Sequence, residues 1–328
     1  MSHGKEFTNM SLVQFDAQDV REAVPMRHAI NAVRTSFLDF AKGAFEMPLR
    51  TVLSDGQFLV MTAHHRPTRS AMVKTLSVNF ETRTPSILGT VTWSNLDNRH
   101  QVVADAGAVT ALRTGAVSGV ATDLLAPATA TTCTVIGAGA QGVDQARAVH
   151  AVRPLSELEI VDNDLARAET VCAHLADELG GHVTLRASTD ANKAVEGKDL
   201  VCCATTSRTP LFDAEALAER AHVNAIGAFR PTMREVPVEA LAGGLVVVDE
   251  RQAVLEESGE IIDALEAGAL RLTDLVELGT ALQQPPVASG RTIFKSVGIA
   301  IQDWAIANLL AELVGDTERD HVGPQKTN

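Results

Sequence analysis

The sequence has no apolar run of the roughly 20 residues that a membrane-spanning helix needs. Its first residues, MSHGKEFTNMSLVQFD, lack the apolar segment of a secretory signal. Basic residues are in the minority, with 28 Lys and Arg against 41 Asp and Glu, and the net charge of −13 argues against nucleic acid and anionic membranes as partners. A local basic pocket can still attract a small anionic substrate. We therefore expect a cytoplasmic protein with no membrane or nucleic-acid partner.

Cysteine is also scarce, and no two cysteines form a C-x-x-C pair. The four are Cys133, Cys172, Cys202 and Cys203. Their apolar or helical surroundings favour buried reduced thiols over a disulfide framework. The sequence has no H-x-x-x-H pattern, and the adjacent His64 and His65 would point to opposite faces of a strand, so we predict no metal site. It has no G-x-S-x-G elbow either, so no nucleophilic triad is indicated.

What the sequence does contain starts with Thr131–Gly142, TTCTVIGAGAQG. A β-branched run breaks into three glycines and then opens a helical pattern. Such glycines permit a tight turn, a close approach of the backbone to a pyrophosphate, and close packing of helix on strand, while the helix N-terminus attracts the anion. The next expected strand ends at an acid, where a ribose contact is expected. The predicted dinucleotide-binding residues are Gly137, Ala138, Gly139, Ala140, Gln141 and Asp162.

Residues 127–290 alternate between strand and helix patterns, which predicts a parallel, doubly wound sheet of the Rossmann type. The expected strands are apolar on both faces, as a sheet covered on both sides requires. They are Cys133–Ile136, Leu158–Val161, Val183–Arg186, Leu200–Ala204, Val223–Ile226 and Leu245–Val248. The expected helices between them are Gln141–Val152, Leu165–Leu179, Ala214–Ala221 and Pro237–Ala242.

Residues 1–126 carry a mixed α/β pattern, and the length of 328 residues suggests about two domains. Val20–Phe45 has helical spacing, and a second helix is expected from an N-cap at Thr110 to Leu125. The strands expected between them are Met47–Leu53, Phe58–Ala63, Met72–Phe80, Val91–Ser94 and Gln101–Ala104. The breaker Ala126–Thr129 marks a domain boundary, and a helix at Val297–Val314 is expected to fold back onto the first domain.

Two basic residues interrupt apolar patterns in the first domain. Lys74 falls on the apolar face of the expected strand Met72–Phe80, and Arg113 falls in the first turn of an apolar helix face. A buried cation needs an anion. For Lys74 the alternative is an edge strand from which the amine reaches solvent, and for Arg113 it is an internal salt bridge. With Arg50 of the MPLR segment, these residues suggest a basic pocket that holds a carboxylate near the cofactor cleft.

Six segments resemble, in order along nearly the whole chain, those of the ornithine cyclodeaminase/μ-crystallin family. They are MPLR at Met47–Arg50, VKTLSVNF at Val73–Phe80, TALRTGA at Thr110–Ala116, GAGAQG at Gly137–Gly142, DLVCCATTS at Asp199–Ser207 followed by Pro210, and IFKSVG at Ile293–Gly298 ending at Asp303. A colinear set of this kind is far more specific than any one of its members.

The resemblance implies a homodimeric enzyme that uses a nicotinamide cofactor on α-amino or α-imino acids. It implies a Rossmann domain, here 127–290, and a substrate-binding and dimerisation domain built from both chain ends, here 1–126 and 291–328. Positions that match the family's contacts to the substrate carboxylate are Arg50, Lys74 and Arg113. The other predicted cofactor contacts are Thr205, Thr206, Ser207 and Lys295.

One departure from the family pattern bears on the reaction. Ornithine cyclodeaminases carry a catalytic aspartate in a G-x-D-x-P-G-K-x-E segment, and Phe229 takes that position in the matching run Gly227–Glu235. Phenylalanine cannot accept a proton, and the segment looks more like that of the family's ketimine reductases. We therefore expect reduction of an α-imino acid, with Δ1-pyrroline-2-carboxylate giving L-proline as the specific prediction. Phe229 and Arg230 would border the substrate, and Lys74 could keep the imine nitrogen protonated.

Several alternatives stay open at this point. They are a true ornithine cyclodeaminase that uses another acid such as Glu235, an alanine dehydrogenase-type activity, and a non-catalytic cofactor-binding protein related to μ-crystallin. A dicarboxylic imine is a further possibility, with its second carboxylate on Arg230, His64, His65 or Arg66. For the cofactor, Asp162 favours NAD(H) over NADP(H), because a carboxylate repels a 2′-phosphate.

Overall fold

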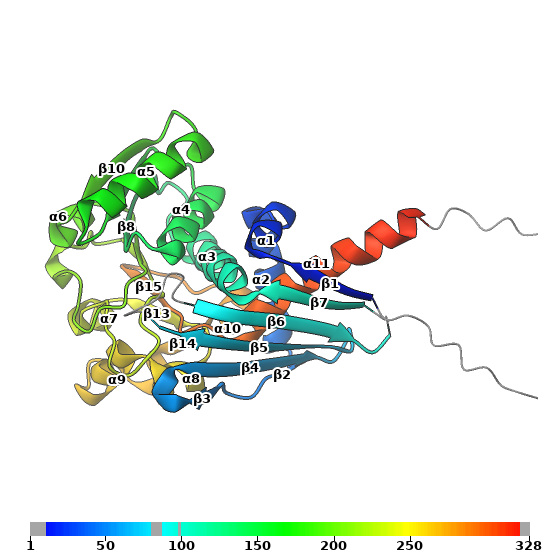
Figure 1. The fold of residues 1–328 in the computed structure, drawn as a ribbon. Helices are drawn as coiled ribbons and strands as arrows, with labels where there is room; N and C mark the ends of the chain where they lie inside the picture. Colours follow the sequence, from blue (N-terminus) through cyan, green and yellow to red (C-terminus); the bar gives the residue numbers. More distant parts are fainter. Residues whose placement is uncertain (1–10, 80–86, 98–99, 322–328) are drawn as a thin grey trace, which may run out of the picture.

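The described residues, 11–79, 87–97 and 100–321, form two sheets with helices around them in a computed structural model (Figure 1). Among these residues, the first sheet has the order β1-β7-β6-β5-β4-β2 with β3 paired to β4, and it is mixed because only β1 and β7 run parallel. The second sheet is parallel throughout, in the order β10-β9-β8-β11-β12-β15-β13-β14. The predicted combination of a Rossmann-type sheet with a second α/β unit is confirmed.

The first unit is built from both ends of the described chain. Its strands are β1 (Ser11–Phe15), β2 (Phe45–Glu46), β3 (Thr51–Leu53), β4 (Phe58–His65), β5 (Ser70–Val78), β6 (Ile87–Asn95) and β7 (His100–Asp105). Its helices are α1 (Ala17–Ala23), α2 (Met26–Ala41), α3 (Ala106–Leu125) and α11 (Ala300–His321), with a 3-10 turn η1 (Ser54–Gly56). Helix α11 packs against α2, α3 and strands β4 to β7, so the end of the chain does fold back onto its beginning.

The second unit holds the remaining elements. Its strands are β8 (Thr132–Ile136), β9 (Glu157–Val161), β10 (Thr184–Ser188), β11 (Leu200–Cys203), β12 (His222–Ala225), β13 (Leu245–Val248), β14 (Leu275–Glu277) and β15 (Thr292–Lys295). Its helices are α4 (Ala140–Val152), α5 (Leu165–Leu179), α6 (Ala191–Val195), α7 (Val238–Ala242), α8 (Arg251–Glu257), α9 (Gly259–Glu266) and α10 (Leu278–Gln283), with 3-10 turns η2 (Ala214–Ala216) and η3 (Leu272–Asp274).

The parallel sheet positions the cofactor loop. Strands β11, β12 and β15 are buried at every residue, because helices and the other unit cover both faces. The strand order reverses between β8 and β11, which lie side by side with Ile136 opposite Cys203. In open parallel sheets, ligands bind outside the carboxyl ends of the strands at such a reversal point. The loops that follow Ile136 and Cys203 therefore border the expected crevice.

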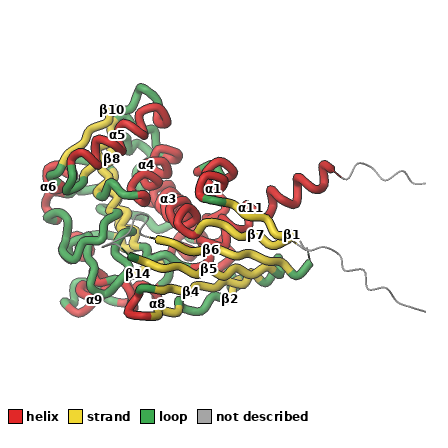
Figure 2. Tube along the Cα trace, in the orientation of Figure 1, coloured by secondary structure: helices red, strands yellow, loops and turns green. Residues whose placement is uncertain are grey.

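The first sheet buries one face and leaves the other accessible. Figure 2 shows β4, β5 and β6 running side by side. Along β5 the even-numbered residues from Ser70 to Val78 are buried, and Val73 and Thr75 between them are exposed. This alternation follows from the two-residue period of a strand with helices against one face. The buried face carries Lys74, which is completely enclosed.

Three sequence predictions in the first unit were wrong in detail. Val20–Phe45 is not one helix, because Pro25 interrupts it and starts α2 as its N-cap. Met47–Leu53 is not one strand, since only its last three residues pair with β4, so Arg50 lies in a connecting segment. Thr110 is not an N-cap, because α3 begins at Ala106 and is capped by Asp105. Arg113 consequently lies in the middle of α3 rather than in its first turn.

Two predictions near the end of the chain also change. The helix expected from Val297 starts at Ala300, and the residues before it form strand β15 in the middle of the parallel sheet. The boundary set at residue 290 would leave this strand with the wrong sheet, so the parallel-sheet unit extends through Lys295. The stretch Ala214–Ala221 forms only the short turn η2. Of the four residues of β15 only Ile293 and Phe294 are apolar, so the sequence pattern there is too short to predict a strand.

In the ranges that the structure describes, no helix is both long and apolar enough to cross a membrane. The four cysteines are free thiols, three of them buried and Cys172 partly buried. Burial raises the pKa of Cys203, and a hydrogen bond with Cys202 together with burial raises that of Cys133. These thiols therefore belong to the packing of the parallel sheet.

Candidate active site

The glycine loop has the geometry of a phosphate cradle. Gly137 has a φ of +110°, which favours glycine, and a Cβ on Gly142 would overlap the Gly137 carbonyl oxygen. By contrast, no atom of the described residues lies within 4 Å of the position where a Cβ on Gly139 would be. Gly139 is also the N-cap of α4 and provides no side-chain cap for the helix. The first turn of α4 thus presents backbone N–H groups beside open space, which fits a dinucleotide pyrophosphate.

Asp162 lies beside this loop at the carboxyl end of β9. Its Oδ2 accepts a hydrogen bond from Ala138 N at 2.9 Å, and its Oδ1 accepts one from Asp164 N at 3.0 Å. The guanidinium of Arg167, one helical turn on, lies 3.7 Å from Asp162 Oδ1. The acid is therefore held against the glycine loop by two backbone N–H groups, with an exposed arginine next to it.

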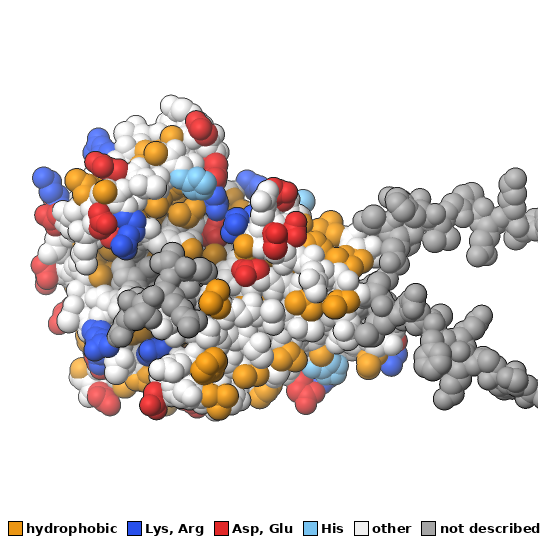
Figure 3. Space-filling view, in the orientation of Figure 1, with side chains coloured by type: hydrophobic (Ala, Val, Ile, Leu, Met, Phe, Trp, Pro, Cys, Tyr) orange, Lys and Arg blue, Asp and Glu red, His pale blue; other side chains and the backbone are white. Residues whose placement is uncertain are grey.

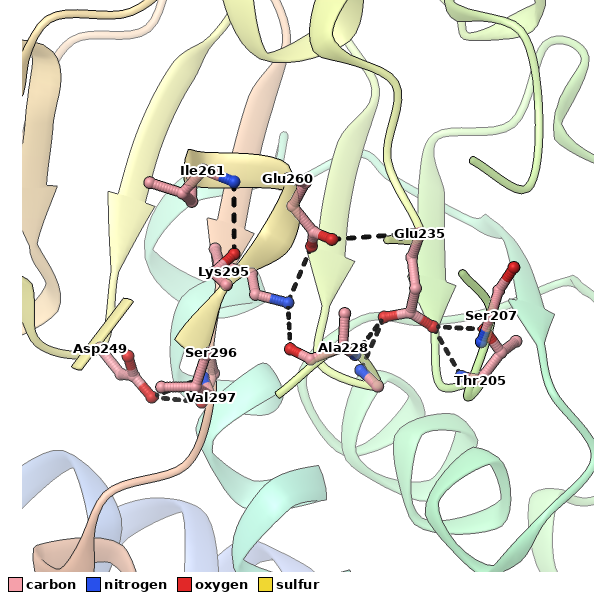
Figure 4. A network of polar contacts seen from close by, with 12 residues as sticks. Thr205, Ser207, Ala228, Glu235, Asp249, Glu260, Ile261, Lys295, Ser296 and Val297 are labelled. Atoms are coloured by element: carbon pink, nitrogen blue, oxygen red, sulfur yellow. Dashed lines mark hydrogen bonds and ion pairs between the residues drawn. The ribbon is translucent and has the colours of Figure 1, made fainter. Parts of the chain in front are cut away.

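On the other side of the reversal point, the loops after β11 and β12 are held by a buried acid (Figure 4). Glu235 Oε1 accepts hydrogen bonds from Thr205 N at 2.6 Å and Thr205 Oγ1 at 2.9 Å. Its Oε2 accepts from Gly227 N at 2.7 Å and Ala228 N at 3.0 Å. Burial raises the pKa of Glu235, although Lys295 acts to lower it. Because it faces backbone donors, Glu235 lies in a supporting position and is not in the place of the missing catalytic aspartate.

The other residues predicted for the cofactor differ in exposure. Thr206 is exposed, whereas the hydroxyl of Ser207 donates to Thr209 O at 2.7 Å. Lys295 is fully buried, donates to Ala228 O at 2.6 Å and lies 2.8 Å from Glu260 Oε1. Among these residues, Thr206 lines the cavity between the units, while Lys295 is buried and donates to the loop after β12. Their contacts with a cofactor stay predictions.

The basic residues of the first unit do come together, around Asp303 of α11. Lys74 Nζ donates to Asp303 Oδ1 at 2.7 Å and to Thr110 Oγ1 at 2.6 Å. Arg113 Nε lies 3.4 Å from the same Asp303 oxygen, and Arg113 Nη1 donates to Gln302 Oε1 at 2.6 Å. Strand β5 lies between β4 and β6, so the edge-strand alternative for Lys74 is excluded. The internal salt bridge considered for Arg113 is present.

Arg50 approaches the same cluster through the residues that follow β15. Its Nη2 donates to Val297 O at 2.9 Å and to Gly298 O, while its Nε lies 2.8 Å from Glu257 Oε1. Gly298 has a φ of +82°, and a Cβ there would overlap the Arg113 guanidinium. The glycine of the FKSVG segment thus lets the chain turn directly against Arg113. We call Arg50, Lys74, Arg113, Gln302 and Asp303 the basic cluster.

Burial governs the ionisation of this cluster. It lowers the pKa of Lys74 to about 8, with Asp303 opposing the shift and Arg113 adding to it. Burial also acts to raise the pKa of Asp303, but Lys74 and Arg113 outweigh it and lower that pKa. Glu257, beside Arg50, has its pKa raised by burial to about 7 in spite of the arginine. Lys74 within the cluster and Glu257 beside it therefore have pKa values close to neutral pH.

Four polar atoms at and beside the basic cluster are buried without a hydrogen-bond partner in the described residues. Two are donors, Arg113 Nε and Gln302 Nε2, and two are acceptors, Asp303 Oδ2 and Glu257 Oε2. Native interiors leave few such atoms unsatisfied unless water or a ligand meets them. A ligand that carries both a carboxylate and an N–H group would satisfy donors and acceptors together.

A cavity of about 580 Å³ separates the two units at the carboxyl ends of β11 and β12. It is lined by Thr206, Arg208, Arg230, Thr232 and Met233 on one side and by Asp55, Gln57, Phe58, Ser77, Val78 and Asn79 on the other. Arg230 donates to Gly56 O at 2.9 Å, and its guanidinium lies 5.4 Å from the half-buried Phe229 ring. No residue of the basic cluster lines this cavity, and Lys74, Arg113, Gln302 and Asp303 are buried.

The histidines do not share this cavity. His64 and His65 end β4, whereas the cavity borders the start of that strand at Phe58. His64 lies 3.6 Å from Glu46, His65 lies 3.6 Å from Asp39, and Arg66 donates to Gly43 O. Of the four residues considered for a second substrate carboxylate, only Arg230 therefore lines this cavity. No group of three or more metal-binding side chains occurs in the described part of the chain.

The sequence reasoning missed several residues of this site. Asp303 was noted only as the end of a family segment, and Gln302 and Glu257 carried no signal, because each lies on a helix whose partners come from distant segments. Glu260 was missed for the same reason. A charged residue with helical spacing is normally expected to face solvent.

Comparisons with known proteins show the family of this chain. The sequence profile of the ornithine cyclodeaminase/mu-crystallin family matches residues 11–318. The chain belongs to this family. A Delta(1)-pyrroline-2-carboxylate reductase of Bacillus cereus is 30% identical over 317 residues, which cover 92% of this chain and 96% of that one.

Two solved structures of the ornithine cyclodeaminase/mu-crystallin family type share the fold. That of Thermococcus litoralis Delta(1)-pyrroline-2-carboxylate reductase in complex with NADH and L-proline has a TM-score of 0.87 at 27% identity and covers 93% of this chain and 98% of that chain. An archaeal alanine dehydrogenase dimer with bound NAD has a TM-score of 0.84 at 26% identity, covering 96% and 99%. The predicted family and the prediction of an NAD(P)-dependent oxidoreductase are confirmed.

Two glycine substitutions should separate folding from cofactor binding. Gly142→Ala forces a methyl group into the Gly137 carbonyl, so we expect a loss of about 1–3 kcal/mol in the free energy of unfolding. Gly139→Ala meets no atom of the described residues, so stability should stay within about 0.5 kcal/mol of the wild type while NADH affinity falls. Chemical denaturation and NADH titration measure the two effects. Unchanged NADH affinity in Gly139→Ala would contradict a pyrophosphate site at this loop.

Proposed function

We propose that this protein is an NADH-dependent reductase of a cyclic α-imino acid, with Δ1-pyrroline-2-carboxylate reduced to L-proline. The observation that carries the proposal is the basic cluster, in which buried donors and acceptors without partners among the described residues lie close together on the first unit. The glycine loop of the second unit, which fits a dinucleotide pyrophosphate, supports the cofactor part of the proposal. The relatives named as Δ1-pyrroline-2-carboxylate reductases, one of them in complex with NADH and L-proline, support this choice.

The cluster suits the two polar ends of an imino acid. Arg113 Nε and Gln302 Nε2 make no hydrogen bond within the described residues and would donate to the substrate carboxylate, with Arg113 Nε also 3.4 Å from Asp303 Oδ1 and Lys74 adding positive charge. Asp303 and Glu257 have free buried acceptors that would take the N–H of a protonated imine. Orientation of this kind supplies a large share of catalysis, because the C=N carbon is held where hydride arrives. NADH, when bound, supplies that hydride.

The reaction then needs one hydride and one proton. The hydride forms a C–H bond at the imine carbon, and the C=N π electrons move to nitrogen, where the iminium proton becomes the amine proton. The protein's task is to keep the nitrogen protonated, since an iminium accepts hydride better than a neutral imine. Lys74, whose pKa is lowered to about 8 by burial, can supply that proton near neutral pH.

Phe229 favours reduction over cyclodeamination of ornithine. The acid considered as a substitute for the missing aspartate, Glu235, is fully committed to Thr205, Gly227 and Ala228. An apolar side chain at Phe229 suits a ring of carbon atoms and gives no base for ammonia loss. Alanine dehydrogenase-type chemistry is the second candidate, and the structural similarity to an archaeal alanine dehydrogenase with bound NAD favours it.

The cofactor preference rests on Asp162. A carboxylate held at the end of β9 suits the ribose hydroxyls of NADH and repels a 2′-phosphate. Arg167 lies 3.7 Å away and reduces that repulsion. We therefore expect NADH to be preferred while NADPH is still used at a lower rate.

A second copy of this chain is the proposed partner of the first unit. Apolar side chains alternate outward from its sheet, where Phe58, Val73 and Leu88 are 50%, 42% and 42% exposed. Figure 3 shows hydrophobic side chains spread over this face among uncharged ones. Contiguous exposed apolar surface of this kind commonly marks an interface, and the similar archaeal alanine dehydrogenase is a dimer.

The function is tested by NADH oxidation with Δ1-pyrroline-2-carboxylate. We expect turnover to L-proline, faster with NADH than with NADPH, and no ammonia from L-ornithine with NAD. Arg113→Lys should lower kcat/KM by about 100-fold, because a single ammonium cannot replace a planar guanidinium. Formation of ammonia and proline from ornithine would refute the inference that Phe229 excludes cyclodeamination. Alanine formation from pyruvate and ammonia, with no imine reduction, would favour the alanine dehydrogenase activity.

The pH dependence of kcat/KM tests the role of Lys74. A lysine with a pKa of about 8 loses its positive charge above that pH, so kcat/KM for the imine should fall as pH rises past about 8. Lys74→Arg should remove this limb and lower kcat/KM, because arginine neither loses its charge nor gives up a proton in this pH range. The substrate nitrogen also titrates, but its limb is the same in both proteins. Identical profiles for the two proteins would rule out Lys74 as the titrating group.

The dimer is tested by sedimentation velocity. The double variant Val73→Asp with Leu88→Asp places charges on the exposed sheet face and should give a monomer, because buried unpaired charges are costly. Val287→Asp changes a side chain that is 98% exposed in a loop away from this sheet face, and it should leave the dimer intact. A wild-type monomer at micromolar concentration, or a double variant that stays dimeric, would refute this interface.

A further inference from the structure

The buried carboxylate of Glu235 holds two loops that come from different strands. It accepts four hydrogen bonds, two from Thr205 after β11 and two from Gly227 and Ala228 after β12. Figure 4 shows these donors converging on one side chain. A Cβ on Gly227 would lie 2.5 Å from Glu235 Oε1, so the loop contacts the acid as closely as a glycine allows. One side chain therefore sets the spacing of both loops.

The position of these loops assigns them to one half of a dinucleotide. Asp162 marks the adenosine side, because it ends β9 on one side of the reversal point. Thr205 and Gly227 follow β11 and β12 on the opposite side. The two mononucleotide halves bind on either side of that point, so these loops face the nicotinamide half.

The support continues from Glu235 to the basic cluster through the end of β15. Glu260 Oε2 accepts from Glu235 N at 3.1 Å, and Glu260 Oε1 lies 2.8 Å from Lys295 Nζ, which also donates to Ala228 O. The next residues are held by Asp249, whose Oδ2 accepts from Ser296 Oγ, Val297 N and Gly298 N at 2.7, 3.0 and 2.8 Å. Gly298 in turn contacts Arg50 and Arg113.

We propose that Glu235 is a positioning residue that fixes the two nicotinamide-facing loops, and that the Lys295–Gly298 segment sets their distance from the basic cluster. The inference rests on the proposed function, because it presumes a nicotinamide cofactor opposite an imino-acid carboxylate. Glu235 touches neither. It acts through the N–H groups that it orients, while Lys295 ties Ala228 to the strand that carries the turn at Gly298.

A carboxylate is required here for a simple chemical reason. All four groups that Glu235 meets are donors, and a carboxylate has only acceptor oxygens. A glutamine would turn an N–H₂ group toward either Thr205 or the pair Gly227 and Ala228, so donor would face donor. One loop would then have to move while the sheet beneath it stays intact.

A matched control exists at the opposite edge of the same sheet. Asp199 Oδ2 accepts from Thr131 N at 2.9 Å, Thr132 N at 3.1 Å and Thr132 Oγ1 at 3.0 Å, and it lies where β8 and β11 begin. Asp199→Asn makes the same change from carboxylate to amide, but all three donors meet one oxygen, so the amide oxygen can still accept from them. It lies at the amino ends of the strands, away from the crevice at their carboxyl ends.

The experiment compares the affinities of the full-length variants for NADH and for ADP-ribose, which lacks the nicotinamide, by calorimetric titration. Glu235→Gln should raise the Kd for NADH about tenfold or more, since a bond to a charged group is lost. Its Kd for ADP-ribose should change less than about twofold. Asp199→Asn should change neither Kd, and both variants should lose stability in denaturant titrations. Thr205→Val removes the hydroxyl bond to Glu235 and the bond that Ser207 N donates to the same hydroxyl, and it keeps the three backbone donors to Glu235. It repeats the test in milder form if Glu235→Gln does not fold.

Equal loss of NADH and ADP-ribose affinity in Glu235→Gln, or no loss of either, would overturn the inference, as would a wild type that binds ADP-ribose as tightly as NADH. These titrations involve no imine. A wild type that shows the NADH-selective effect but reduces no imine would refute the proposed substrate and leave the role of Glu235 standing. Imine reduction by a Glu235→Gln protein with wild-type NADH affinity would support the proposed substrate and refute the role of Glu235.

Discussion

The charge of Lys74 has to be compensated inside the protein, and Asp303 compensates it. The lysine comes from the middle of a strand and the aspartate from the last helix, 229 residues later, and both side chains are completely buried. An unpaired ion in such a position would cost several kcal/mol, so the two chain ends must meet for either charge to exist there. Arg113 shares the same carboxylate oxygen. The return of α11 to the first sheet is thus an electrostatic as well as an apolar requirement.

The segment through which the chain returns to the first unit contacts residues of both units. The chain leaves the parallel sheet at the end of β15, turns at Gly298 against Arg113, and starts α11 two residues later. That short connection contacts both units, because Lys295 donates a hydrogen bond to the loop after β12 and the Gly298 carbonyl accepts one from Arg50. In the proposed reaction this segment connects the loops on the hydride-donating side with the cluster on the accepting side, and Asp249 accepts hydrogen bonds from three of its donors.

Much of this could be predicted from local patterns. The glycine loop, Asp162 and the alternation of strands and helices are short-range features, since each depends on residues close together in sequence. Lys74 and Arg113 were noticed because a charge in an apolar pattern violates the expected periodicity. Strand β15 was missed because only Ile293 and Phe294 of its four residues are apolar, and so short a pattern predicts no strand. The break at Pro25 was missed although the residue is visible, because the helical spacing continues on both sides of it.

The sequence by itself determined the elements, the cofactor loop and the presence of buried cations, because periodicity, glycine conformation and the cost of burying charge act over a few residues. Only the tertiary structure decided which anion meets those cations and which acid serves the loops. Asp303, Glu257, Glu260 and Glu235 all lie in helices or loops whose partners come from distant parts of the chain. A carboxylate in a sequence does not reveal whether it faces water or a buried donor, since that depends on which surface the completed fold places against it.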